Sequence, residues 1–127
     1  MAITTNYSTI PGLTAGADLS TSQFKVVKLA TTAGQVVLAA SSVLTQAFVL
    51  MNNPASGEAA EVAYDGVVKV LAGTSNLAIG EIVGVTTTST VIDTTTDNRF
   101  VLGKALEAST AVSDVVSILL IPGGVRY

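Results

Sequence analysis

Short valine-rich runs, separated by turn residues, follow one another from Phe24 to the end of this sequence. They recur at intervals of roughly 8–12 residues, which is typical of an all-β sandwich or barrel. Valine and threonine are abundant, and both suit the half-buried surface of a pleated sheet. No segment has the apolar period of an amphipathic helix. The expected strands are 24–30, 35–40, 47–52, 59–64, 67–72, 81–86, 90–94, 99–107 and 114–121.

The second half of the chain repeats the pattern of the first. Residues 26–63 align with residues 82–118 if two small gaps are allowed. The alignment sets Val36 against Val91, the FVL triplet at 48–50 against that at 100–102, and Glu61-Val62 against Asp114-Val115. Identity is low but the pattern is consistent, so the sequence predicts a duplicated β-unit.

One stretch must be weighed as a membrane span, because residues 29–57 carry no charge and 33–51 are long enough to cross a bilayer. Polar and glycine residues interrupt it, and its β-branched clusters indicate two separate strands. Its counterpart in the second half contains Asp93, Asp97, Arg99 and Lys104. Two copies of one unit should share an environment, so we expect a soluble protein with no membrane partner.

Residues 1–23 differ from the body at 24–127, since they are small, polar and without a strand or helix period. They contain no basic segment followed by an apolar run, so we expect no signal peptide. Isolated apolar residues occur along the whole segment, whereas a solvated tail would be polar throughout. We therefore expect an extended N-terminal arm that becomes ordered on a partner. A frayed terminus is the alternative.

Charge and residue types exclude several functions. Charged residues make up 12% of the chain, roughly half the usual share of about 25%, and interface cores are depleted in charge, so we expect assembly. The net charge is −3 and the six basic residues are scattered, which opposes nucleic-acid binding. Cysteine and histidine are absent, so disulfides, thiolate chemistry and the commonest general base are excluded.

Three carboxylates, Glu58, Glu61 and Asp65, lie close together in this charge-poor sequence. Asp65-Gly66 stands between two alternating runs, which is the strongest short-range signal for a hairpin turn. Glu58 ends the loop that begins at Pro54, and Glu61 fits the polar face of the next strand. We therefore interpret all three as turn and surface residues.

The functional alternatives for these carboxylates lack support. A paired-carboxylate hydrolase needs one acid in an apolar pocket and a second acid placed to act with it. No histidine, arginine or aromatic platform lies nearby in the sequence, and the spacing is not that of a calcium loop. Residues 93–97 could form a cation loop, but Thr/Asp clusters are usually turns. We predict no catalytic residue, no metal and no cofactor.

Four segments, in order, resemble the small capsid cement or decoration proteins of tailed bacteriophages. They are AGADLSTSQFKVVKL (15–29), QAFVLMNNPASGEAAEVAYDGVVKVLAG (46–73), AIGEIVGV (78–85) and VLGKALEASTAVSDVVSILLIPGG (101–124). Each motif alone is weak, but the ordered set spans most of the chain. This resemblance implies a compact β-barrel or β-tulip-like body with an N-terminal arm, and no enzymatic activity.

The resemblance also implies a partner and a place. The chain would bind the major capsid protein on the outer surface of the head, across junctions between capsid subunits, and oppose internal DNA pressure. It would be made in the bacterial cytoplasm and would self-associate, with a trimer favoured over a dimer. Candidate contact residues in the arm are Ile3, Tyr7, Ile10, Pro11 and Leu13. The alternative function is that of a surface-displayed carbohydrate- or cell-binding β-module, although such modules usually expose tryptophan or tyrosine. Enzymatic activity is the third possibility.

Overall fold

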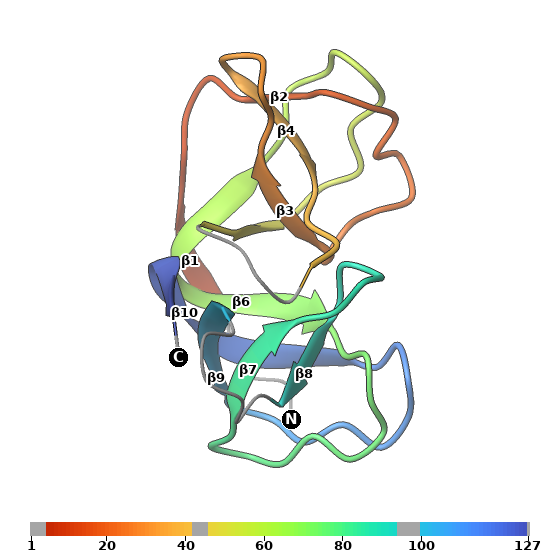
Figure 1. The fold of residues 1–127 in the computed structure, drawn as a ribbon, viewed down its shortest axis with the longest axis vertical. Coiled ribbons are helices and arrows are strands. Elements are labelled where there is room, and N and C mark those ends of the chain that lie inside the picture. Colours follow the sequence, from red (N-terminus) through yellow and green to blue (C-terminus); the bar gives the residue numbers. More distant parts are fainter. Residues whose placement is uncertain (1–4, 42–45, 94–99, 127) are drawn as a thin grey trace.

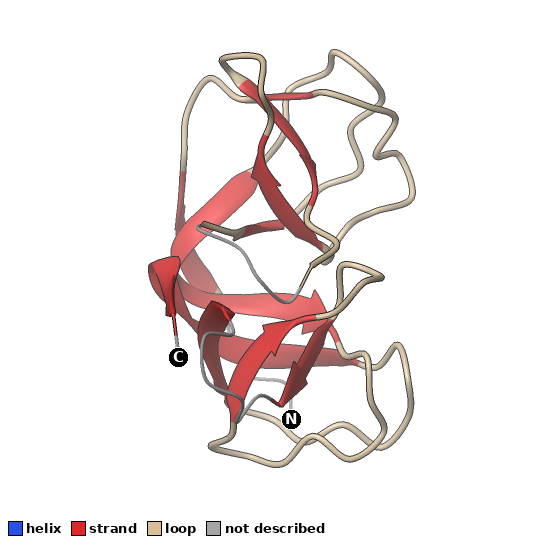
Figure 2. Cartoon of the chain, in the orientation of Figure 1, coloured by secondary structure: helices blue, strands red, loops and turns tan. Residues whose placement is uncertain are grey.

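The chain is built from strands and loops (Figure 2), as expected for an all-β protein. The computed structural model describes residues 5–41, 46–93 and 100–126. Within these ranges no helix is long and apolar enough to cross a membrane. The strands are β1 (Asn6–Thr9), β2 (Thr14–Ala15), β3 (Val26–Leu29), β4 (Gln35–Leu38), β5 (Phe48–Leu50), β6 (Val62–Leu71), β7 (Ile82–Val85), β8 (Val91–Asp93), β9 (Phe100–Ala105) and β10 (Val115–Arg126).

These strands form one sheet that is open rather than closed into a ring. Its order is β2-β4-β3-β5-β6-β10-β9-β7-β8, and β1 pairs with β6 beside this path. The long strands β6 and β10 cross the middle of the molecule, with β2 to β5 on one side and β7 to β9 on the other (Figure 1). The resulting body is a small β-rich domain with two halves.

The two halves share one topology, which supports the predicted duplication. Along the sheet, β4-β3-β5-β6 on one side matches β8-β7-β9-β10 on the other. Backbone hydrogen bonds also recur at equivalent places, each about the same length in both halves. Ala15 N donates to Glu58 O (2.9 Å) and Ala72 N to Asp114 O (2.8 Å). Gly16 N donates to Val36 O (2.8 Å) and Gly73 N to Val91 O (2.7 Å). Gly57 N donates to Ala15 O (2.9 Å) and Ser113 N to Ala72 O (2.8 Å).

Two parts of the predicted alignment are wrong. Val27 and Val83 hold equivalent places in β3 and β7, and they pair with Phe48 and Gly103, so the two FVL triplets are not equivalent. In the same way, the residue equivalent to Asp114 is Glu58 and not Glu61.

Buried side chains form two clusters. The larger cluster fills the half built on β7 to β10 and extends across β6, and it contains Phe100, Leu102 and Ile118. The smaller cluster lies under β2 to β5 and contains Leu19, Phe48 and Leu50. Strand β6 contributes to both clusters, because its residues alternate between the two faces of the sheet.

The hairpin turn predicted at Asp65-Gly66 is not formed. Strand β6 runs from Val62 to Leu71 without interruption. Gly66 does adopt a positive φ of 101°, but Asp65 does not, and a type I′ turn requires both. Glycine is needed here because β1 passes so close that a Cβ atom on residue 66 would overlap the backbone oxygen of Asn6.

The segment expected to be an arm is extended but pairs with the body. Strand β1 is antiparallel to β6, and β2 is parallel to β4. Ala15 and Leu19 are buried in the smaller cluster. Only one side chain of β1, that of Tyr7, is partly buried, so its sequence carries no visible strand period.

The duplication predicts a stabilising change. Ser113 holds a φ of 74° at the place where the first half has Gly57 with a φ of 83°. A non-glycine residue with a positive φ destabilises the folded state by about 1–2 kcal/mol. A glycine lowers the free energy of unfolding by about 0.5–1 kcal/mol, because it raises the entropy of the unfolded chain. Ser113→Gly should therefore raise the free energy of unfolding by about 0.5–1 kcal/mol in urea denaturation. Ala111→Gly in the same loop, where φ is not positive, should lower it.

Candidate functional site

The expected contact residues divide between the core and the surface. Ile3 lies outside the described residues. Tyr7 and Leu13 are half-buried and pack against the larger and the smaller cluster, respectively. Ile10 is also half-buried and packs against the smaller cluster, while Pro11 is exposed. Of the four that the structure describes, Ile10 and Pro11 also border an open pocket.

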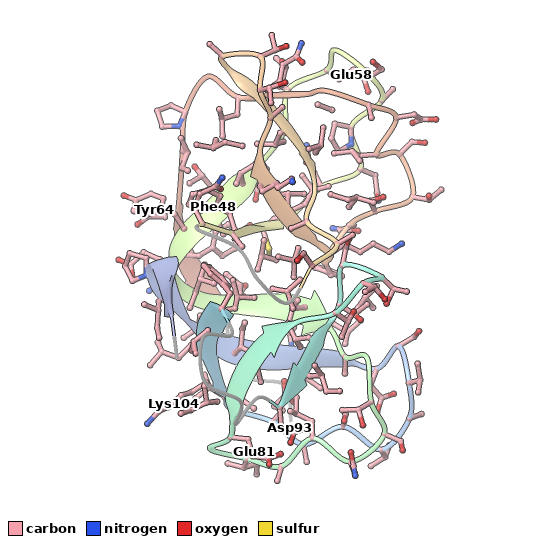
Figure 3. The ribbon with its side chains drawn as sticks, in the orientation of Figure 1. Phe48, Glu58, Tyr64, Glu81, Asp93 and Lys104 are labelled. Carbon is pink, nitrogen blue, oxygen red and sulfur yellow. The ribbon has the colours of Figure 1, made fainter. Side chains whose placement is uncertain are left out.

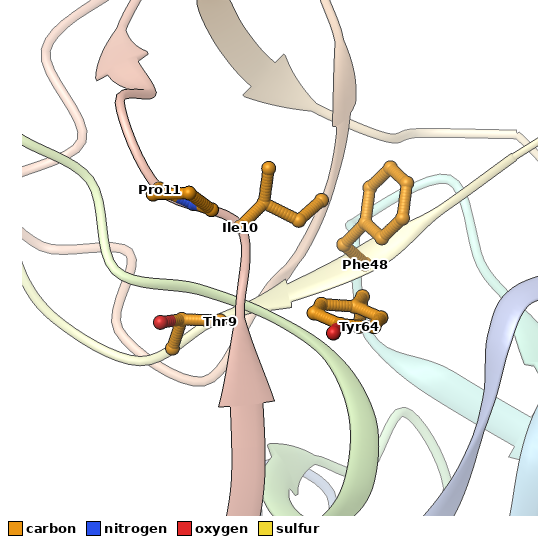
Figure 4. Close-up of a pocket in the computed structure, with 5 residues that line it drawn as sticks. All are labelled: Thr9, Ile10, Pro11, Phe48 and Tyr64. Carbon is orange, nitrogen blue, oxygen red and sulfur yellow. The ribbon is translucent and has the colours of Figure 1, made fainter.

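These two residues line a pocket of about 330 Å³ together with Thr9, Phe48 and Tyr64. We call it the Ile10 pocket. The side chain of Ile10 points toward Phe48 and Tyr64, and Pro11 lies on the other side of Ile10 (Figure 4). No charged side chain lines the Ile10 pocket, so it suits an apolar group.

Three separate parts of the chain build the Ile10 pocket. Thr9 ends β1, and the next residue is fixed by a hydrogen bond from Ile10 N to Val62 O (3.0 Å). The pairing of β1 with β6 shifts register between Ser8 and Thr9, which leaves Tyr64 as an extra residue in β6. Such a bulge bends a strand and re-aims side chains, which explains why Tyr64 is available here.

Sequence reasoning identified Ile10 and Pro11 but missed the residues from other strands. Phe48 stands in the FVL triplet of an expected strand and is buried, at 8% exposure. Tyr64 precedes the apparent Asp-Gly turn. Neither residue has a local sign of a pocket, because the pocket arises only when β1, β5 and β6 come together.

A hydrogen bond holds β1 on the body beside the Ile10 pocket. The Tyr7 hydroxyl donates to Glu61 Oε2. This hydrogen bond, with smaller contributions from burial and from the charge of Glu61, raises the pKa of Tyr7 to about 12. Glu61, one of the three clustered carboxylates, therefore fixes β1 in place.

The raised pKa predicts how β1 responds to alkali. Folded Tyr7 holds its proton more tightly than the unfolded chain does, so the hydrogen bond contributes fully below pH 10. Its contribution is lost as the pH rises from 10.0 toward about 12. Ultraviolet titration of tyrosinate should show one component near pH 12 that is absent from Tyr7→Phe. An unchanged titration in that variant would contradict this assignment.

Of the other two clustered carboxylates, Glu58 closes a loop and Asp65 is an exposed residue within β6. Glu58 Oε1 accepts a hydrogen bond from Ala55 N (2.7 Å). In the equivalent loop of the second half, Asp114 Oδ2 accepts from Thr110 N (2.7 Å) and Ala111 N (3.0 Å). Hydrogen bonds from Thr110 and Ala111 lower the pKa of Asp114.

Acidic groups do not gather elsewhere on the described part of the chain. Glu58 lies at one end of the long axis, whereas Glu81 and Asp93 lie toward the other (Figure 3). Within residues 5–41, 46–93 and 100–126, no three acidic side chains are placed to share a metal ion. Lys69 pairs with Glu107 at 3.3 Å between half-buried side chains. Hydrogen bonds from Ser117, with Lys69 adding to them, lower the pKa of Glu107.

Comparison with known proteins gives one match. A sequence model of the family described as "Phage cement protein" matches residues 19–120. The matched range contains β3 to β9 and the first part of β10, and it leaves out β1 and β2. No curated protein matches the chain.

Proposed function

Because the chain belongs to the phage cement protein family, we propose that it binds the outer surface of a phage head across junctions between major-capsid-protein subunits. Membership of the family gives the chain a structural role in the phage capsid and implies a role without catalysis. The observation that carries the proposal is the family match over residues 19–120, which covers both halves of the duplicated body.

The surface of the protein supports such an assembly. Large apolar side chains are exposed on several strands and loops, including Ile79 at 72% and Val112 at 64%. Single exposed apolar residues are ordinary, but here they occur with only 12% charged residues. A surface poor in charge loses little solvation energy when a partner covers it.

Cementing follows from a chain that touches two capsid subunits at once. Separation of those subunits under internal DNA pressure would then require loss of one contact with the cement protein. Self-association into a trimer, or a dimer, would raise the effective concentration of each further contact. The protein would be made in the bacterial cytoplasm and added to the outside of the head.

Co-sedimentation with expanded heads that lack the protein tests the proposal. The full-length chain should pellet with the heads in a saturable way, at a fixed ratio to the capsid protein. Heads with bound protein should also release DNA at a higher temperature than bare heads.

Deletion of residues 1–20 is unsuitable as a control, because it removes β1, β2 and the buried Leu19 and so unfolds part of the body. Folded full-length protein that pellets with no head, or pellets without saturation, would overturn the proposal. A glycan array would then test the carbohydrate-binding alternative.

A further inference from the structure

We propose that β1 and the Ile10 pocket together form the docking site for an extended segment of the major capsid protein. The segment adds a strand beside β1 and places an apolar side chain in the Ile10 pocket. This inference rests on the proposed function, because it names the surface and the binding mode through which the capsid is recognised.

Strand β1 lies at an outer edge of the sheet. Gly66 and Val67 pair with β1 and also with β10, so these two strands lie on opposite sides of β6. Among the described strands, β1 pairs with β6 alone. Within the described part of the chain its second edge is therefore unpaired, and an extended chain can pair with the backbone groups there.

This edge lacks two of the usual protections against pairing, a charge and a proline. Natural edge strands are commonly very short, or carry a charge or a proline. Strand β2 has only two residues, and β8 carries the exposed Asp93 and is bridged to Ala72 through Val91. In contrast, β1 has four residues, Asn6 to Thr9, with neither a charge nor a proline.

The Ile10 pocket lies where β1 ends. A strand that pairs with the free edge of β1 and continues past Thr9 reaches Ile10 and Pro11, which line the pocket. In strand addition, backbone hydrogen bonds supply affinity and side-chain pockets supply specificity. The apolar lining selects a segment with a large apolar residue at the matching position, and excludes a charged one, which would be buried without a partner.

A charge at the rim of the Ile10 pocket provides the first test. Thr9 is exposed and lines the pocket, so Thr9→Glu should fold normally and place a carboxylate beside the docked apolar side chain. Asn6→Glu is the matched control, because Asn6 is exposed at the other end of β1 and does not line the pocket. Thr9→Glu should bind expanded heads about tenfold or more weakly, and Asn6→Glu within about twofold of the unchanged protein.

Hydrogen exchange on the bound protein provides the second test. Strand addition should slow exchange of the β1 amides when heads are present, whereas the exposed loop at 31–34, between β3 and β4, should keep its rate. If the unchanged protein binds heads but β1 gains no protection, or the two variants bind equally, the docking site is wrong and the proposed function stands. If the unchanged protein does not bind heads at all, the proposed function itself fails.

Discussion

Gly66→Ala is expected to lower the free energy of unfolding by about 2–5 kcal/mol. Alanine is disfavoured at a φ of 101°. Its Cβ atom would also overlap the backbone oxygen of Asn6 and approach Tyr7 Cα to 2.9 Å. Both contacts are with backbone, so no side-chain rotation relieves them, and β1 would have to move away from β6. Urea denaturation measures the loss directly.

Gly34→Ala is the matched control for that change. Gly34 has a φ of 81°, but a Cβ atom there would meet nothing within 4 Å. This variant should lose only the backbone strain of about 1–2 kcal/mol. Equal losses in the two variants would show that β1 does not press on Gly66, and the close approach of β1 would no longer explain why glycine is needed within the unbroken strand β6.

The same glycine shows why the predicted hairpin is wrong. Asp-Gly between two alternating runs is the signature of a type I′ turn, and Gly66 does take a positive φ. The local sequence cannot distinguish a glycine that turns the chain from one that admits a neighbouring strand. The neighbour here is β1, which lies about 60 residues earlier in the chain, so only the tertiary structure decides between the two.

The body of the protein was predictable because its signals are local and occur twice. The expected strands at 35–40, 81–86 and 99–107 contain β4, β7 and β9 with errors of one or two residues at most ends. The alignment of Val36 with Val91 pairs β4 with β8, which hold equivalent places in the two halves. Alternating apolar residues and turn residues determine such strands. Because the pattern occurs twice, the strands expected in one half support those expected in the other.

The candidate site was only partly predictable, because its parts are distant in the sequence. Ile10 and Pro11 stand out as apolar residues in a polar segment. Phe48 and Tyr64 join them through the register of β1 on β6 and the extra residue in that strand. Register depends on which faces are buried, and β1 offers a single partly buried side chain from which to infer it.

Two phenylalanines with different surroundings allow the stability of the fold to be separated from docking. Phe100 is 2% exposed in the larger cluster, whereas Phe48 belongs to the smaller cluster and lines the Ile10 pocket. Phe100→Ala should lower the free energy of unfolding by about 3–5 kcal/mol and the Tm by roughly 10–20 °C.

Phe48→Ala should be less destabilising than Phe100→Ala, because Phe48 is less completely buried, at 8% exposure against 2%, and borders the Ile10 pocket. It should, however, weaken binding to expanded heads, since it removes one wall of the Ile10 pocket. Phe100→Ala, measured at a temperature at which it remains folded, should bind heads as the unchanged protein does. Calorimetry and co-sedimentation of both variants would measure the two effects. The reverse pattern, with head binding lost in Phe100→Ala and kept in Phe48→Ala, would place the docking surface on the other half of the molecule.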